Sequence, residues 1–225
     1  MSIAPKSTDQ IEPPRIGTDL EQRTDLPGAP LDDEARYDAL ELTGARVLDA
    51  RASRVIVAAS RLRSVSLAAG VLPGLELIDD RLDDCDLANI EIESGSLERV
   101  ELVGCRLVGL KAPESRWRDV VARECNASLA QFRYATFRRV RFEHCDLRSA
   151  DFLGADLRGV VFDDCDLRNA TLSSTRLAGA DLSTSRIEGL QVGIESLRGA
   201  IVEPLQAAQL AALMGLKILW EGPGD

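Results

Sequence analysis

Five cysteines and one histidine are the side chains of this 225-residue chain best suited to bind a metal or to act as a nucleophile. The cysteines follow one another at intervals of 20 residues, and His144 directly precedes one of them. Zinc-binding thiolates come in closely spaced pairs, which this sequence lacks, and a single histidine excludes a histidine-rich metal site. The sequence also contains no glycine-rich phosphate-binding motif. We therefore expect no catalytic residue, no metal, no cofactor and no enzyme activity.

The cysteine interval is part of a repeat that runs through most of the chain. Residues 145–169 read CDLRS ADFLG ADLRG VVFDD CDLRN in groups of five. Steps of five from Leu42 to Val202 give 33 positions, and every one holds an apolar residue. A second, smaller inward position lies two residues before each. Since residues two apart on an extended chain face the same side, each group points two side chains inward and uses the other three to turn a corner.

The cysteines also indicate how many groups of five complete one coil. All occupy the smaller inward position, and Val100, Val120, Val140 and Val160 repeat with the same interval. Four groups therefore make one four-sided coil, and about eight coils stack ~4.8 Å apart into a rod roughly 40 Å long. In this arrangement the thiols are small core groups that point away from the ring of His144, which argues against cysteine–histidine catalysis. The cysteines are Cys85, Cys105, Cys125, Cys145 and Cys165.

The repeat resembles the pentapeptide-repeat family, whose A(D/N)LXX pattern is seen here as ADLRG at 155–159 and ADLST at 180–184. The resemblance covers residues 40–202 and implies an all-β, right-handed quadrilateral β-helix. We expect a mostly disordered N-terminal tail over 1–36, the β-helix over 37–203, and a short C-terminal α-helix with a tail over 204–225. The helix either caps the open end of the solenoid or mediates a homodimer, as in some family members. Its candidate residues for these two roles are Leu205, Leu213, Met214, Leu216, Ile218, Leu219 and Trp220.

Charge is distributed unevenly along the chain, whose net charge is −10. Residues 1–39 carry −5 and residues 203–225 carry −2, so the repeat region 40–202 carries only −3. The N-terminus has no apolar run long enough for a signal peptide, and no stretch could span a bilayer. We therefore expect a cytoplasmic protein with reduced thiols.

Within the repeat region the charges form two bands. Residues 76–101 have a net charge of −8, and residues 102–141 have a net charge of +6. Arg118, Arg138 and Arg158 share one phase of the 20-residue repeat and are expected to form an outward column, either paired locally or available to an acidic partner. The remaining candidate contact residues are Asp79, Asp83, Asp84, Asp86, Glu91 and Glu93 in the acidic band.

Two irregular features of the inward positions lead to further predictions. Ala112, Ala122 and Ala127 fall in one coil with Trp117, so we expect the indole to fill the space that the small side chains leave. Asp80 and Glu195 also occupy inward positions, and we expect both carboxylates to turn outward because burying an unpaired carboxylate is costly.

Two functions are compatible with these features. The first is a non-catalytic scaffold that binds another protein through the regular faces of the rod. The alternative, implied by the resemblance, is a DNA mimic that binds and protects DNA gyrase or topoisomerase IV in antibiotic resistance or self-immunity. The nearly neutral repeat region and its basic band weaken the second hypothesis, because duplex DNA is uniformly anionic. We expect no membrane association and no direct binding of nucleic acid.

Overall fold

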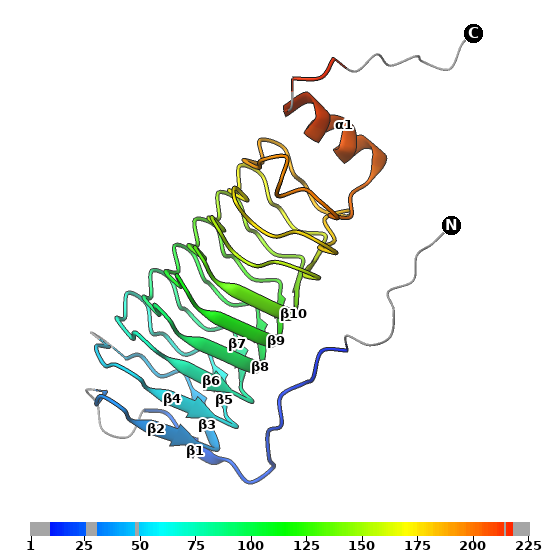
Figure 1. Cartoon of the computed structure of the whole chain (residues 1–225). Helices are drawn as coiled ribbons and strands as arrows, with labels where there is room; N and C mark the ends of the chain where they lie inside the picture. Colours follow the sequence, from blue (N-terminus) through cyan, green and yellow to red (C-terminus); the bar gives the residue numbers. More distant parts are fainter. Residues whose placement is uncertain (1–9, 26–30, 48–49, 214, 218–225) are drawn as a thin grey trace.

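The structure is a computed structural model that describes residues 10–25, 31–47, 50–213 and 215–217. These residues form a parallel β-solenoid of about seven turns with one short helix near the C-terminal end, where the sequence predicted about eight turns (Figure 1). The predicted stacking is confirmed, because the strand pairs from β2 onward join residues 20 apart. Examples are Leu62 with Leu82, Leu97 with Trp117, and Phe142 with Phe162.

Short strands lie on two neighbouring walls of the solenoid. β2, β4 and β6 follow one wall, β3, β5 and β7 follow the next, and β8, β9 and β10 each run across both. Isolated parallel bridges join successive coils on the other two walls. The strands are β1 (Glu21–Arg23), β2 (Arg36–Asp38), β3 (Leu40–Thr43), β4 (Ile56–Ala58), β5 (Arg61–Arg63), β6 (Glu76–Ile78), β7 (Arg81–Asp83), β8 (Ser96–Val103), β9 (Arg116–Arg123), β10 (Thr136–Glu143) and β11 (Val161–Asp163).

The apolar positions spaced five apart form the core of the rod. Of the 33 positions, 29 are buried, and the other four are half-buried against the core: Val57, Val192, Leu197 and Val202. The residue just before each small inward position turns the corner with a left-handed backbone, as at Asp79, Asp84 and Asn89 (φ 59°, 52° and 54°). Glycine, aspartate and asparagine tolerate this conformation best and hold several of these positions; others hold residues such as Arg99 and Tyr134, where the stacked coils impose it.

The five cysteines are free, buried and stacked in one column, as predicted. Each Sγ also donates a hydrogen bond to backbone carbonyls, such as the 3.4 Å bond from Cys105 to the oxygen of Leu82. Ser185 continues the column one coil after Cys165 and accepts a hydrogen bond from the backbone N–H of that cysteine at 3.0 Å. The thiols are therefore polar partners of the corner backbone as well as small core groups.

The prediction that Asp80 turns outward is wrong. Its side chain is fully buried, and its carboxylate accepts hydrogen bonds from the backbone N–H groups of Ser60 at 2.8 Å and Ile78 at 3.0 Å. The expected cost of burial assumed an unpaired carboxylate, whereas this corner presents two donors to it. Burial nevertheless outweighs these bonds and raises the pKa of Asp80 to about 7. Glu195 is exposed and pairs with Arg198, as expected.

Trp117 lies in the core, as the volume argument predicted. It is 1% exposed, and its Nε1 donates to the hydroxyl of Ser115 at 3.0 Å. Its ring contacts Phe132 and Phe137, with centroids 5.5 and 5.6 Å away. The three neighbouring alanines are buried as well, so the indole occupies a coil that otherwise has little side-chain volume.

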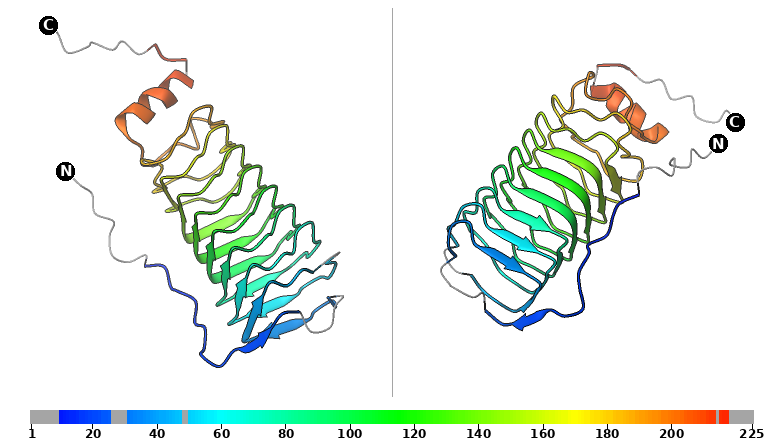
Figure 2. Two further views of the ribbon diagram at one scale, coloured as in Figure 1. Left: turned by 180° about the vertical axis from the view of Figure 1, so that it is seen from behind. Right: turned by 60° about the horizontal axis from the view of Figure 1, so that its bottom comes forward.

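The helix α1 (Pro204–Leu213) lies at the C-terminal end of the rod (Figure 2). Its buried residues are Gln206 and Leu210, four positions apart on one face. The amide of Gln206 donates to the carbonyls of Leu182 and Ser185 at 2.7 and 2.6 Å, so it satisfies acceptors that the last complete coil leaves open. Among the described residues, no helix is both apolar and long enough to cross a bilayer.

Residues 10–25, hereafter the N-terminal segment, run along the outside of the rod from its first coils toward the middle (Figure 2). The strand β1 in this segment pairs in parallel with β3, and Leu31 belongs to the core. This part of the chain therefore differs from the expectation of a mostly disordered tail over 1–36. The sequence pattern missed it because the segment is anchored by backbone groups and has no apolar repeat.

Candidate functional site

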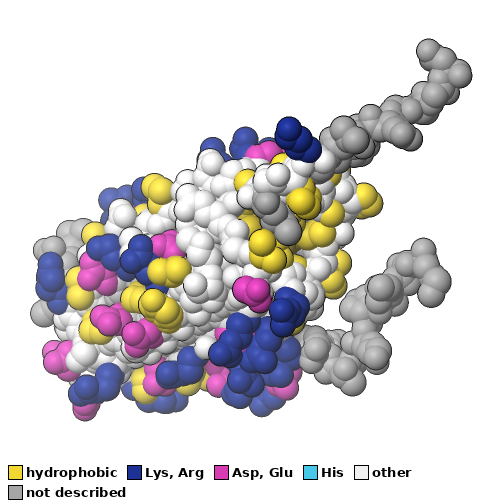
Figure 3. Space-filling model, turned by 45° about the horizontal axis from the view of Figure 1, so that its top comes forward, with side chains coloured by type: hydrophobic (Ala, Val, Ile, Leu, Met, Phe, Trp, Pro, Cys, Tyr) yellow, Lys and Arg dark blue, Asp and Glu magenta, His cyan; other side chains and the backbone are white. Residues whose placement is uncertain are grey.

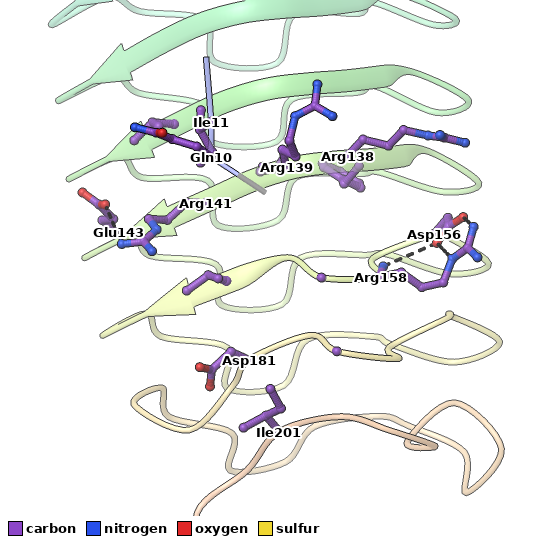
Figure 4. A pocket seen from close by; sticks show the side chains of 16 residues that line it. Gln10, Ile11, Arg138, Arg139, Arg141, Glu143, Asp156, Arg158, Asp181 and Ile201 are labelled. Carbon is purple, nitrogen blue, oxygen red and sulfur yellow. Dashed lines mark hydrogen bonds and ion pairs between the residues drawn. The ribbon is translucent and has the colours of Figure 1, made fainter. Parts of the chain in front are cut away.

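A groove of about 1020 Å³, hereafter the axial groove, lies on the face formed by β9, β10, β11 and the coils that follow. Figure 4 shows Gln10 and Ile11 of the N-terminal segment at one end of it, with Asp181 and Ile201 at the other. Its floor is apolar where Val121 and a second small side chain face outward. The second is Val161, and the backbone of Gly179 completes this part of the floor.

Four arginines line the axial groove, and three of them pair with carboxylates. Arg139 contacts Asp119 at 2.5 Å, Arg141 contacts Glu143 at 3.5 Å, and Arg158 contacts Asp156 at 2.6 Å. The hydrogen bond from Arg158 lowers the pKa of Asp156, so this pair is ionised at neutral pH. The fourth, Arg138, is exposed, and no described side chain forms an ion pair with it.

The structure separates the three members of the predicted arginine column. Arg118 and Arg138 lie opposite each other in β9 and β10, as the register predicted. Arg118 pairs with Glu98 one coil earlier and does not line the axial groove, whereas Arg138 and Arg158 do. Local pairing therefore neutralises two of the three arginines, and Arg138 is the one available to a partner.

A second charged column lies at the corner beside the groove and holds Asp79, Arg99, Asp119 and Arg139, hereafter the Asp–Arg column. Arg99 binds the carboxylate of Asp79 through two nitrogens at 2.6 and 2.8 Å, and Arg139 binds Asp119 through two at 2.5 Å. The hydrogen bonds from Arg99 lower the pKa of Asp79. Burial opposes ionisation of Asp119, but its hydrogen bonds to Arg139 and Glu12 outweigh it and lower the pKa.

The two aspartates of this column also hold the N-terminal segment. Asp119 Oδ1 accepts a hydrogen bond from the backbone N–H of Glu12 at 3.2 Å. Asp79 Oδ1 accepts one from the backbone N–H of Arg15 at 3.0 Å. Asp79 was a predicted contact residue, whereas no sequence pattern connects Asp119 with the N-terminal segment.

Most of the predicted acidic contact residues have cationic partners. Asp79 pairs with Arg99. Three more carboxylates of the band pair with Arg81, Arg106 and Lys111, in that order. Those pairs involve Asp83 at 2.8 Å, Asp86 at 3.0 Å and Glu91 at 2.6 Å. Only Asp84 and Glu93 have no ion pair with a described residue. The band of net charge −8 is therefore largely compensated at its own surface.

Among the described residues, no three histidine, cysteine, aspartate or glutamate side chains lie together as a metal site would require. His144 is exposed, and its Nδ1 lies 3.1 Å from the carboxylate of Asp164 one coil later. The thiol of Cys145 instead points inward to the carbonyl of Ala122 at 3.3 Å. All five thiols are buried and donate to backbone carbonyls, so solvent-borne reagents do not reach them in the folded chain.

The outer surface of the C-terminal helix is apolar. Leu205, Leu213 and Leu216 are all more than half exposed, and hydrophobic side chains gather at this end of the rod while basic ones crowd another part of the same face (Figure 3). These leucines were predicted either to cap the coil or to mediate dimerisation; Gln206 and Leu210 cap the coil instead, and Leu216 lies just after α1. The other candidates of this group, Met214, Ile218, Leu219 and Trp220, lie outside the described residues.

Comparison with known proteins finds similarity to pentapeptide-repeat proteins. Residues 95–172 match the family model described as a pentapeptide repeat region. Among solved structures, HetL, a pentapeptide repeat protein involved in heterocyst differentiation regulation from the cyanobacterium Nostoc sp. strain PCC 7120, is similar over 76% of this chain and 87% of its own, with 18% identity and a TM-score of 0.45. QnrB1, a plasmid-mediated fluoroquinolone resistance protein, is similar in a trypsin-treated form over 89% of this chain and 100% of its own, with 16% identity and a TM-score of 0.40. No curated protein sequence matches significantly.

Proposed function

We propose that this chain, whose residues 95–172 match a pentapeptide repeat region, is a non-catalytic scaffold whose axial groove binds an acidic, extended segment of another protein. The observation that carries the proposal is Arg138, an exposed cation without an ion pair among the described residues, beside an apolar floor. A partner carboxylate would pair with Arg138 while small apolar side chains cover Val121 and Val161. Such a contact combines charge complementarity at the edge with burial at the centre.

The charges around Arg138 support an anionic rather than a cationic partner. The acidic groups of the groove already have arginine neighbours, apart from Asp181, which has no ion pair with a described residue. A cationic segment would have to displace those arginines, whereas an anionic one only replaces water at Arg138.

Affinity capture with the full-length protein tests the proposal. Wild type, Arg138→Glu and the matched control Arg118→Glu are immobilised, and proteins bound from cell extract are quantified by mass spectrometry. We expect Arg138→Glu to lose its specific partner by about tenfold or more, as for a charge reversal at a contact centre, and Arg118→Glu to keep it. The same bound proteins on all three forms would contradict the proposal, and so would an equal loss on both variants.

DNA mimicry is the second candidate, and the paired acidic band argues against it. A DNA mimic needs unpaired carboxylates at a spacing close to that of phosphates, and here four of the six acidic candidates have cationic partners. We expect micromolar protein to leave a fluoroquinolone's inhibition of DNA gyrase unchanged in a supercoiling assay. Protection of the enzyme would replace the scaffold proposal.

The outer face of α1 supports association of two copies. Capping already uses Gln206 and Leu210, so the exposed Leu205 and Leu213 of α1, together with Leu216 just after the helix, are left to cover their copies in a symmetric contact. Light scattering after size exclusion should give a dimer for wild type and a monomer for Leu205→Gln with Leu213→Gln. A wild-type monomer at about 100 μM would exclude this role, since a specific interface of ordinary size binds more tightly.

A further inference from the structure

We infer that the Asp–Arg column is a binding surface for extended segments with two successive prolines, and that residues 12–15 of this chain occupy it as an internal ligand. The internal ligand is Glu12-Pro13-Pro14-Arg15. The backbone N–H of Glu12 donates to Asp119, and the backbone N–H of Arg15 donates to Asp79. The partner is thus a Pro-Pro segment of another protein that competes with this internal copy. The inference does not depend on the partner proposed for the axial groove.

The spacing of the two carboxylates fits a polyproline II helix. Asp79 and Asp119 are two coils apart, which is ~9.6 Å along the rod. Three residues of polyproline II advance ~9.3 Å and complete one turn, so the N–H groups of residues 12 and 15 point to the same side. Pro13 and Pro14 favour this conformation, because each fixes its own φ and restricts the residue before it to extended geometry.

Both prolines also remove the donors that the column could not satisfy. Proline has no N–H, so the stretch has two donors, and each has a carboxylate acceptor. The side chains of Glu12 and Arg15 are exposed and pair with each other at 2.7 Å. Recognition therefore depends on the spacing of the backbone N–H groups, and the side chains at positions 12 and 15 are free to vary.

The acceptors are held in place before any segment binds. Asp119 is 2% exposed and bound by two nitrogens of Arg139, and Asp79 is bound in the same way by Arg99. Carboxylates fixed by arginines lose little side-chain freedom on binding, and a bond from N–H to an ionised carboxylate is stronger than a neutral one. At the other positions of this corner the side chains are alanine or absent, as at Ala59 and Gly159, so no further acceptor extends the surface.

A labelled peptide of residues 9–17 is the probe, and full-length protein is the receptor. In wild type the internal segment competes at an effective concentration near millimolar, so the peptide should bind weakly. Pro13→Gly with Pro14→Gly loosens the internal segment without shortening the chain, and this form should bind the peptide about tenfold or more tightly than wild type. Equal binding to the two forms would overturn the inference.

Substitution of the carboxylates shows whether binding uses the proposed surface. In the Gly-Gly background, Asp119→Asn should weaken peptide binding about fivefold or more, and the control Asp84→Asn should leave it unchanged. A peptide with alanines in place of its two prolines should bind less tightly than the probe. Equal peptide binding with and without Asp119→Asn in the Gly-Gly background would overturn the inference. Since Asp119→Asn could also disturb the fold, hydrogen exchange provides a test in wild type: rapid exchange at the amides of Glu12 and Arg15 would exclude the internal ligand.

Discussion

Replacement of Asp80 by serine should abolish a pH dependence of stability that the wild-type protein shows between about pH 4 and pH 7. The Asp80 carboxyl is fully buried, and burial raises its pKa from 3.8 to about 7 in the folded state. Between these values the folded chain holds a proton that the unfolded chain has lost. Folding stability therefore falls as pH rises through this window and is constant above it.

The size of the effect follows from the pKa difference of about three units, at roughly 1.4 kcal/mol for each unit. The full loss is about 4 kcal/mol, and about 2.5 kcal/mol of it falls between pH 5 and pH 8. This is a large part of the stability of an ordinary domain. A carboxyl with this location thus costs the protein stability at neutral pH, although its two backbone hydrogen bonds recover part of it.

Serine is the right replacement because the same column already contains one. Ser60 accepts a hydrogen bond from the N–H of Leu40 at 3.0 Å and donates to the carbonyl of Ala58 at 2.8 Å. A serine at position 80 would repeat this arrangement one coil later without a charge. The Asp80→Ser variant should therefore fold, and it should be more stable than wild type above pH 7.

Urea unfolding at pH 5, 6, 7 and 8 measures the difference between wild type and Asp80→Ser, in which the other titrating groups cancel. That difference should grow by about 2.5 kcal/mol in favour of the variant over this range. Asp84→Ser removes an exposed carboxylate from a nearby corner and serves as the control, with no change in slope. Parallel curves for wild type and Asp80→Ser would refute the buried position of the carboxyl.

Three further predictions concern the core and the cap. Trp117→Ala should lower the free energy of unfolding by about 3–5 kcal/mol. Trp117→Phe should lower it by clearly less, because phenylalanine keeps most of the ring volume and loses the hydrogen bond to Ser115. Equal losses for the two variants in urea unfolding would mean that ring volume is not what stabilises this coil. Gln206→Leu should expose the last coil, and amide hydrogen exchange in residues 180–201 should speed up by about tenfold, because two carbonyls lose their donor while the solenoid before them keeps its protection. None of the five cysteines should react with a thiol reagent in the native protein within minutes, and all should react in guanidinium; a native reaction would show that the cysteine column opens.

The stacking of the coils could be predicted from the sequence because one chemical constraint repeats without interruption. Each group of five must bury its apolar pair, and the cysteines at equal intervals identify which residues lie above one another. Once the 20-residue interval is known, the column that contains Cys105 and the position of Trp117 follow directly. The site was predictable to the same extent: the interval placed Arg118 opposite Arg138, but the sequence did not show that Glu98 neutralises the first of them and not the second.

The helix shows why the apolar pattern alone was insufficient at the ends of the rod. Leu205 and Leu213 are exposed although they are as apolar as the buried Leu210, whereas the polar Gln206 is buried. The last coil presents unpaired carbonyls as well as apolar surface, so a donor is needed there more than another methyl group. A pattern of hydrophobic residues contains no information about such acceptors.

Asp80 and Asp119 follow a common rule that neither residue reveals alone. In a solenoid a polar side chain can have a partner 20 residues away, so the cost of burying it must be judged from the neighbouring coil as well as from the adjacent sequence. Asp80 has Ser60 one coil before it, and Asp119 has Arg139 one coil after it. The N-terminal segment does not follow this rule, because it runs across the coils and its two donors are three residues apart instead of 20. Its two donors coincide with the carboxylates only because three residues of an extended proline-containing chain span the same distance as two coils.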